Sequence, residues 1–248
     1  MFEGHPYSLI PIEVEAFNDQ DSICKGTGFL YAQGASFYFV SNWHIFAGYD
    51  QFAKQYSHPD RLSPNRLRLT IRKPSFPDTS IADLYIFDLN GPTWLQHPRG
   101  PEIDVACVKF PSGDPTMSYT MANGPNNSSL IPLRVGDEMA VLGFPDLGGS
   151  AERLPIWKFG RIASEPHYPI NALPCFLIDS TASMGMSGAP VFSIRADDEK
   201  GELGSFSGIY FSQAQSSINY LGLGVVLKAS VIGETILGKQ LGRLPRNP

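Results

Sequence analysis

The sequence has few charged residues and no long apolar run. Only 17% of its 248 residues are charged and the formal net charge is −5, so a broad basic footprint for nucleic acid is not expected. No apolar run approaches membrane-spanning length, and the first 20 residues lack the basic start and apolar core of a secretory signal. These absences predict a cytoplasmic protein that binds neither nucleic acid nor a membrane.

Cysteine is also scarce. The three residues Cys24, Cys107 and Cys175 cannot all pair within one chain, and none stands at metal-ligand spacing from another. Cys107 and Cys175 lie in apolar runs, where a free thiol usually packs as a small hydrophobe. This pattern favours a reducing compartment and gives no indication of a bound metal.

Glycine and proline, by contrast, are plentiful, with 24 and 21 residues. Such a composition favours short strands and turns over long helices. The strand signals fall into two groups of about six, separated by a stretch rich in Pro, Gly, Ser and Asn. We therefore predict an all-β fold of two six-stranded antiparallel barrels followed by a short C-terminal helix. The predicted ranges are 1–118 for the first barrel, 119–129 for a linker, 130–228 for the second barrel, and 229–248 for the helix and tail.

One serine stands between glycines in the run Gly185-Met186-Ser187-Gly188-Ala189-Pro190. A nucleophilic serine needs a tight turn, in which Oγ projects outward while backbone N–H groups converge on one small volume. Glycine at 185 permits a backbone conformation that is costly for other residues. The N–H groups of Gly185 and Ser187 would then form an oxyanion hole. An ordinary Gly-rich turn between two strands explains the same run about equally well.

Two residues upstream stand where they could serve such a serine. His44 follows an apolar strand signal that ends at Ser41, and Asp104 leads into the apolar run 105–110. Taken alone, a histidine there is more often structural, and an aspartate there is by default a turn residue. A carboxylate at the mouth of a strand can, however, hold a neighbouring imidazole. The rival candidates are His97 and His167 as imidazoles, Asp83 and Asp88 as carboxylates, and Ser183 as the serine.

Four stretches resemble chymotrypsin-fold serine peptidases in order and spacing, and most closely the bacterial trypsin-like peptidases of the HtrA (Deg) kind. They are Gly26-Thr27-Gly28-Phe29, Ser41-Asn42-Trp43-His44-Ile45, Asp104-Val105-Ala106 and Gly185-Met186-Ser187-Gly188-Ala189-Pro190. The resemblance implies that His44 is the general base, Asp104 its orienting carboxylate and Ser187 the nucleophile. It also implies a serine endopeptidase that acts on polypeptides through an acyl-enzyme, without metal or cofactor.

The same resemblance implies a primary substrate pocket and some departures from the family pattern. It implies that the segments 180–184 and 207–211 wall the pocket, and the residues it singles out are Thr181, Ala182, Ser207, Gly208 and Ile209. Thr181 stands where trypsin-like members carry an acidic residue, and burying a cation beside an uncharged threonine is costly, so we expect cleavage after uncharged residues. Met186 replaces the aspartate that pairs with a newly cut N-terminus in digestive members. The serine turn must then be ordered by its own packing, by substrate, by an oligomer or by an activating partner. No peptide-binding module of the HtrA kind is expected after the helix.

A second interpretation is a catalytically silent or latent protein that uses the peptidase fold for binding or as a scaffold. The presence of all three catalytic residue types argues against it, because a non-catalytic descendant has no physical need to keep them. Fold alone does not separate the two hypotheses.

Overall fold

The computed structural model describes residues 3–111, 121–124, 132–146, 154–180, 183–194, 204–211 and 222–245. These residues are mostly β, with few and short helices. In the first half the elements are η1 (Pro6–Leu9), β1 (Ile12–Asn18), β2 (Asp21–Gln33), β3 (Ser36–Ser41), α1 (Trp43–Ala47), β4 (Tyr49–Asp50), β5 (Gln55–Tyr56), β6 (Arg66–Arg72), β7 (Thr79–Tyr85), β8 (Phe87–Asp88), β9 (Gly91–Pro92), β10 (Leu95–Gln96), η2 (Gly100–Glu102) and β11 (Ala106–Phe110). In the second half they are β12 (Glu138–Gly143), β13 (Ile156–Arg161), β14 (Cys175–Ile178), β15 (Pro190–Ser193), β16 (Phe206–Phe211), β17 (Gly224–Lys228), α3 (Ser230–Gly238) and β18 (Gln240–Leu241).

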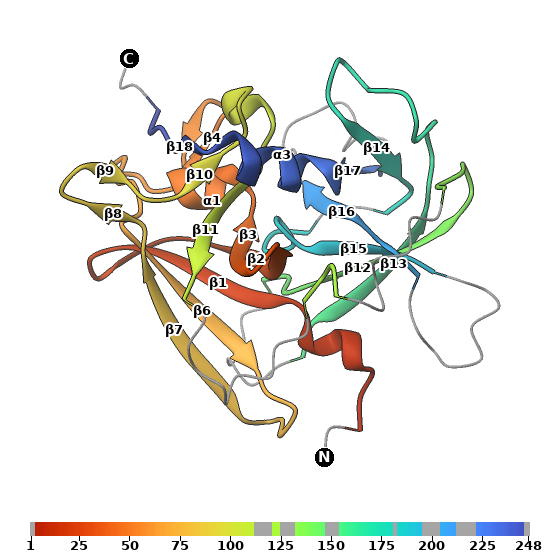
Figure 1. Ribbon diagram of the computed structural model, residues 1–248, viewed down its shortest axis with the longest axis horizontal. Helices are drawn as coiled ribbons and strands as arrows, with labels where there is room; N and C mark the ends of the chain where they lie inside the picture. The colour runs from red at the N-terminus through yellow and green to blue at the C-terminus, as the bar shows by residue number, and fades with distance from the viewer. Residues whose placement is uncertain are drawn as a thin grey trace.

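The first half forms a sheet of eight strands, in the order β18-β10-β11-β3-β2-β1-β6-β7 (Figure 1). The prediction of six strands is therefore wrong for this half. The additional pairing comes from β10 and from β18, which returns from the far end of the chain: Leu95 pairs with Leu241 and Gln96 with Gln240. Each of these strands has only two residues, which is too short for an alternating pattern to appear in the sequence.

The second half forms a six-stranded sheet that curls into a half-barrel, in the order β13-β12-β15-β16-β17-β14. All of its neighbouring strands are antiparallel, and the predicted strand number holds here. The predicted C-terminal helix is also confirmed as α3. Figure 1 shows α3 between β10 and β17.

A single hydrophobic cluster joins the two halves. Phe29 from β2 and Phe206 from β16 belong to it, with ring centroids 5.3 Å apart, and Phe192 lies 5.7 Å from Phe206. The apolar side of α3, including Val231 and Ile232, closes the same cluster. Burying these side chains against one another holds the two sheets in a fixed relation.

The predicted linker is described only at residues 121–124. Asn123 exchanges two hydrogen bonds with the backbone of Ala32 on β2, at 2.9 and 2.8 Å, so this short piece is fastened to the first sheet. The predicted division into four ranges stays a prediction.

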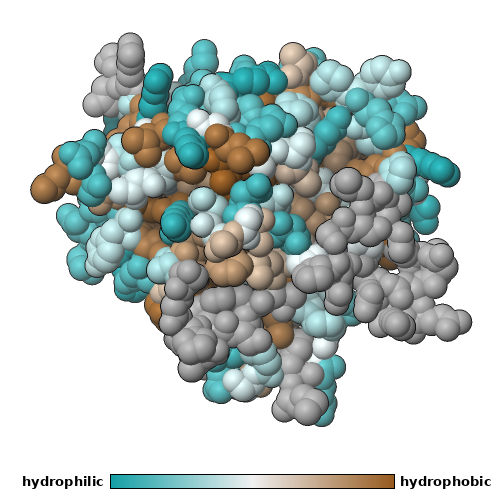
Figure 2. All heavy atoms as spheres, in the orientation of Figure 1, coloured by the Kyte–Doolittle hydropathy of each residue, from teal (hydrophilic) through white to brown (hydrophobic). Residues whose placement is uncertain are grey.

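On the face of the molecule that Figure 2 shows, hydrophilic and apolar side chains are mixed. None of the helices that the structure describes is long and apolar enough to cross a membrane. Within the described ranges, no group of three or more His, Cys, Asp and Glu side chains could hold a metal ion. The three cysteines are free, and burial raises the pKa of Cys24 and of Cys107 to about 12, so these two thiols are poor nucleophiles.

Candidate active site

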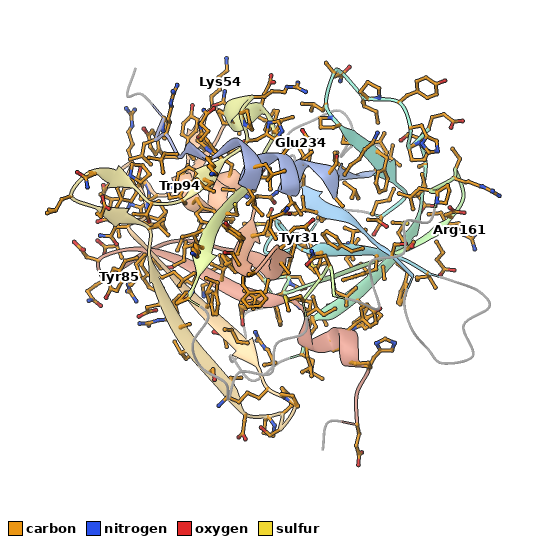
Figure 3. All side chains as sticks on the ribbon, viewed as in Figure 1. Tyr31, Lys54, Tyr85, Trp94, Arg161 and Glu234 are labelled. Atoms are coloured by element: carbon orange, nitrogen blue, oxygen red, sulfur yellow. The ribbon has the colours of Figure 1, made fainter. Side chains whose placement is uncertain are left out.

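His44 lies on α1, a five-residue helix that begins two residues after β3 ends. Trp43 and Phe46 of this helix are buried and pack against Trp94, with ring centroids 6.3 and 5.4 Å apart (Figure 3 labels Trp94). Gly48, at φ +65°, ends the helix in the left-handed conformation that glycine favours. This packing fixes the backbone of His44, while its side chain stays 19% exposed.

Asp104 lies between η2 and β11 and is only 2% exposed. Its carboxylate holds His44 at two points: Oδ1 accepts the backbone N–H of His44 at 2.9 Å, and Oδ2 lies 2.7 Å from Nδ1. Asn42 in turn donates from Nδ2 to the carbonyl of Asp104 at 2.7 Å. With the proton of Nδ1 directed at the carboxylate, the lone pair of the neutral imidazole lies on Nε2. The structure thus brings His44 and Asp104 together in the geometry that a general base requires.

The pKa of His44 lies above its ordinary value. Burial lowers this pKa, but the charge of Asp104 and its hydrogen bond raise it by more, and the charge of Asp50 adds to the increase. The imidazolium form is therefore stabilised, which favours proton transfer to this side chain.

The residues before the candidate nucleophile form a tight reverse turn. Met186 donates its N–H to the carbonyl of Ser183 at 3.1 Å, and Gly185 has φ +85°. A bond from the fourth to the first residue, with positive φ at the third, is typical of a type II turn and requires glycine there. The N–H of Asp146 holds the carbonyl of Met184 at 2.8 Å, and a Cβ on Gly185 would lie 2.9 Å from that nitrogen.

The turn continues through Ser187 into β15. The carbonyl of Met186 accepts the N–H of Ala189 at 3.0 Å, and Gly188 donates to the carbonyl of Tyr210 at 3.0 Å. Gly188 also has φ +85°, so both glycines of the motif adopt conformations that disfavour other residues. Ser187 keeps 9% of its surface exposed.

Contacts from β2 hold this turn against the first sheet. Thr27 donates its N–H to the carbonyl of Ser187 at 2.9 Å and its Oγ1–H to the carbonyl of Gly185 at 2.8 Å. The N–H groups of Gly185 and Ser187 have no hydrogen-bond partner among the described residues. These are the two groups expected to form an oxyanion hole, and both remain available to a substrate oxygen.

Gly26 marks the place where the serine turn meets the histidine helix. A Cβ on Gly26 would lie 3.1 Å from the carbonyl oxygen of Ser187 and 2.9 Å from Cδ1 of Ile45, the residue after His44. Within the described part of the chain, no hydrogen bond joins Ser187 Oγ to His44. Catalytic hydrogen bonds are often long in the absence of substrate and tighten only in the complex.

Comparison with protein families identifies the chain. A family model described as the trypsin-like peptidase domain matches residues 26–198. The chain belongs to the trypsin-like peptidase domain family. Among solved structures, this peptidase domain is similar to the serine endoprotease from Yersinia pestis, with a TM-score of 0.58 and 14% sequence identity. That match covers 93% of this chain and 62% of the other, and at such identity it shows the fold alone. The search of curated proteins finds no match.

Two of the rival residues of the peptidase domain, His97 and Asp83, have other partners. His97 Nε2 lies 3.1 Å from a carboxylate oxygen of Glu234, which Figure 3 labels on α3. Asp83 pairs with Arg66 at 2.9 Å and with Arg68 at 3.0 Å across β6 and β7. His97 is therefore held by α3 and Asp83 by the two arginines of β6.

Two of the predicted pocket residues, Thr181 and Ala182, lie outside the described residues. The other three are buried on β16. Ser207 lines a cavity of about 470 Å³ together with Pro132 and His167, and Ile209 lies in the cluster shared by the two halves. On the strand itself, Gly208 pairs with Val191 and Ile209 with Pro190 of β15, directly after the serine turn.

Tyr210 is the residue of β16 whose backbone bonds to the serine turn; the sequence analysis included it in the pocket strand 207–211 without singling it out. Neighbouring residues of a strand point to opposite faces, so Tyr210 lies opposite Ile209 and packs in the cluster that includes Met186. Its hydroxyl lies 3.5 Å from the carbonyl of Ser180, and a Cβ on Gly224 would lie 2.7 Å from its ring. The signal that could have found it is this alternation, counted from Ile209.

Proposed function

We propose that this peptidase domain is an active serine endopeptidase with Ser187 as nucleophile, His44 as general base and Asp104 as the carboxylate that orients the base. Family membership supports a serine peptidase. The observation that carries the triad is the two-point contact of the Asp104 carboxylate with the backbone and Nδ1 of His44. A buried aspartate that served only to end a loop would have no need to hold an imidazole.

The chemistry follows from these positions. His44 Nε2 takes the hydroxyl proton as Ser187 Oγ bonds to the scissile carbonyl carbon, and Asp104 stabilises the imidazolium that forms. The N–H groups of Gly185 and Ser187 stabilise the negative charge on the carbonyl oxygen. Collapse of this intermediate breaks the C–N bond, and His44 gives its proton to the departing amine. Water then attacks the acyl-enzyme with His44 again as base, which releases the acid and regenerates Ser187.

For specificity, we propose cleavage after uncharged residues of small or medium size. The Tyr210 ring occupies the space between Ser180 and Gly224, next to the segment that carries Thr181. The ring is 2% exposed, and burial raises the pKa of its hydroxyl, so it offers a side chain no negative charge. A lysine or arginine side chain placed there would lose hydration without gaining an ion pair.

A fluorophosphonate probe tests the proposed activity. Such a probe reacts with a serine that a neighbouring base activates, so we expect one modification per chain, located at Ser187 by mass spectrometry. Ser187→Ala should abolish labelling, and replacing the exposed Ser230 of α3 with alanine provides a matched control that should label as the wild type does.

Two outcomes would contradict the proposal. Labelling that survives Ser187→Ala, or that maps to Ser183, would assign the nucleophile elsewhere. A folded wild-type chain that is not labelled at all would favour the silent or latent scaffold.

A further inference from the structure

Thr27 lies on β2 of the first sheet, yet most of its polar contacts are with the second half of the chain. The residue is fully buried, at 0% exposure. Its Oγ1 donates to the carbonyl of Gly185 at 2.8 Å and accepts the N–H of Phe144 at 3.0 Å. Its N–H donates to the carbonyl of Ser187 at 2.9 Å, and its own carbonyl accepts Ser41 Oγ at 2.7 Å. Every polar group of Thr27 therefore has a partner.

The two carbonyls that Thr27 holds belong to the residues whose N–H groups form the proposed oxyanion hole. Because a peptide unit is planar, a bond to the carbonyl of Gly185 also orients the N–H of Met186, which itself binds Ser183. In the same way, the bond to the carbonyl of Ser187 orients the N–H of Gly188. The peptide unit that carries the Ser187 N–H lies between these two held units, and its orientation is therefore restricted on both sides.

The surroundings of Thr27 keep its hydroxyl in place. A Cβ on Gly143 would lie 2.9 Å from Thr27 Oγ1 and 2.9 Å from Met186 Sδ, so only glycine at 143 leaves room for both atoms. The ring of Phe144, whose N–H binds the hydroxyl, lies 4.0 Å from the guanidinium carbon of Arg72. The donor to Thr27 is thus itself fastened to β6 of the first sheet.

We propose that Thr27 is a positioning residue of the peptidase site, an inference that rests on the proposed function. Its hydroxyl and amide hold the serine turn in the conformation that leaves the N–H groups of Gly185 and Ser187 free for the substrate oxygen. Met186 has no charge to pair with an ammonium group, and Thr27 supplies the ordering contact from within the fold. Only a hydroxyl serves here, because one atom must donate to Gly185 and accept from Phe144.

Two substitutions at position 27 separate the hydroxyl from the shape of the side chain. Thr27→Val keeps the branched shape and removes the hydroxyl, whereas Thr27→Ser keeps the hydroxyl. Turnover of a peptide substrate is measured per active site, and the sites are counted by stoichiometric phosphonate labelling. We expect Thr27→Val to lower kcat by about 10²-fold with little change in KM, because a misplaced oxyanion hole is felt in the transition state. Thr27→Ser should restore most of the lost turnover.

A merely structural role would give a different result, since the melting temperature would fall while each labelled site turned over at the wild-type rate. That result, or equal impairment of the Val and Ser variants, would overturn the inference. If Thr27→Val does not fold, Thr27→Ala and Thr27→Ser make the same comparison, because they differ only in the hydroxyl. A wild-type chain without Ser187-dependent turnover would overturn the proposed function itself, and this inference with it. An active wild type with an unimpaired Thr27→Val overturns this inference alone.

Discussion

Replacing Asp104 with asparagine tests the pairing on which the proposed chemistry depends. Asp104 accepts two bonds from one residue, the backbone N–H of His44 at 2.9 Å and Nδ1 at 2.7 Å. Asparagine offers one oxygen and one NH2 group instead. If its oxygen keeps the backbone N–H, its NH2 group faces Nδ1, and the imidazole proton moves to Nε2. A protonated Nε2 has no lone pair to accept the proton of Ser187.

The opposite orientation of the amide is no better. It places the NH2 group against the backbone N–H of His44 in a site where residue 104 is 2% exposed, and a buried donor without an acceptor costs about 1–3 kcal/mol. The first orientation is therefore preferred, and in it the imidazole of His44 carries its proton on Nε2, where the lone pair is needed. In the general Ser-His-Asp template this substitution lowers kcat about 10⁴-fold, equivalent to about 5 kcal/mol of transition-state stabilisation. We expect a loss of the same order here.

The assay is kcat/KM on a peptide substrate, with the melting temperature as a check on folding. Asp83→Asn is the matched control, because Asp83 pairs with Arg66 and Arg68 and has no contact with His44; this variant should keep wild-type turnover. A folded Asp104→Asn enzyme within tenfold of the wild type would refute the reasoning, and so would a large loss in Asp83→Asn.

Two further predictions follow from the same site. Turnover should fall as pH drops through the pKa of His44, because the imidazolium cannot accept a proton. Asp104 raises that pKa, so the loss of turnover should begin at a higher pH than for an ordinary histidine. A kcat/KM that stays constant from neutral pH down to about pH 5 would contradict this. A peptide library should be cut mainly after uncharged residues, because Tyr210 fills the space beside Ser180; a cleavage profile dominated by lysine or arginine would contradict it.

The second half of the fold was predictable because its strands are local, apolar runs. The apolar run 206–211, for example, is buried at every described position, and it predicts a strand without knowledge of the strands that it pairs with. The first half was harder, since β10 and β18 have two residues each and their partners lie far apart in sequence. His44 was expected at the end of a strand, and the structure places it on a short helix after β3.

In the candidate site, too, local motifs were predictable and contacts between residues far apart in sequence were not. The contexts of His44, Asp104 and Ser187 are short motifs, and their resemblance to a known family sufficed to select them. The bond from Thr27 to Gly185 spans 158 residues, and no local pattern indicates which carbonyl a buried threonine will hold. Tyr210 was placed in the pocket strand but not singled out, because the choice between neighbouring strand residues depends on which face meets the turn.

The pairing of β18 with β10 has a consequence for when the helix of His44 acquires its full support during synthesis. Gly242 donates its N–H to the carbonyl of Trp94 at 2.8 Å, and Trp94 in turn packs against the helix of His44. Domains generally fold as units as they leave the ribosome, but here the support of the proposed general base comes from β18, which is synthesised after every other described strand. A growing chain that lacks β18 leaves the carbonyl of Trp94 without this partner, so the proposed hydrolytic activity is expected only once residues 240–242 have been added.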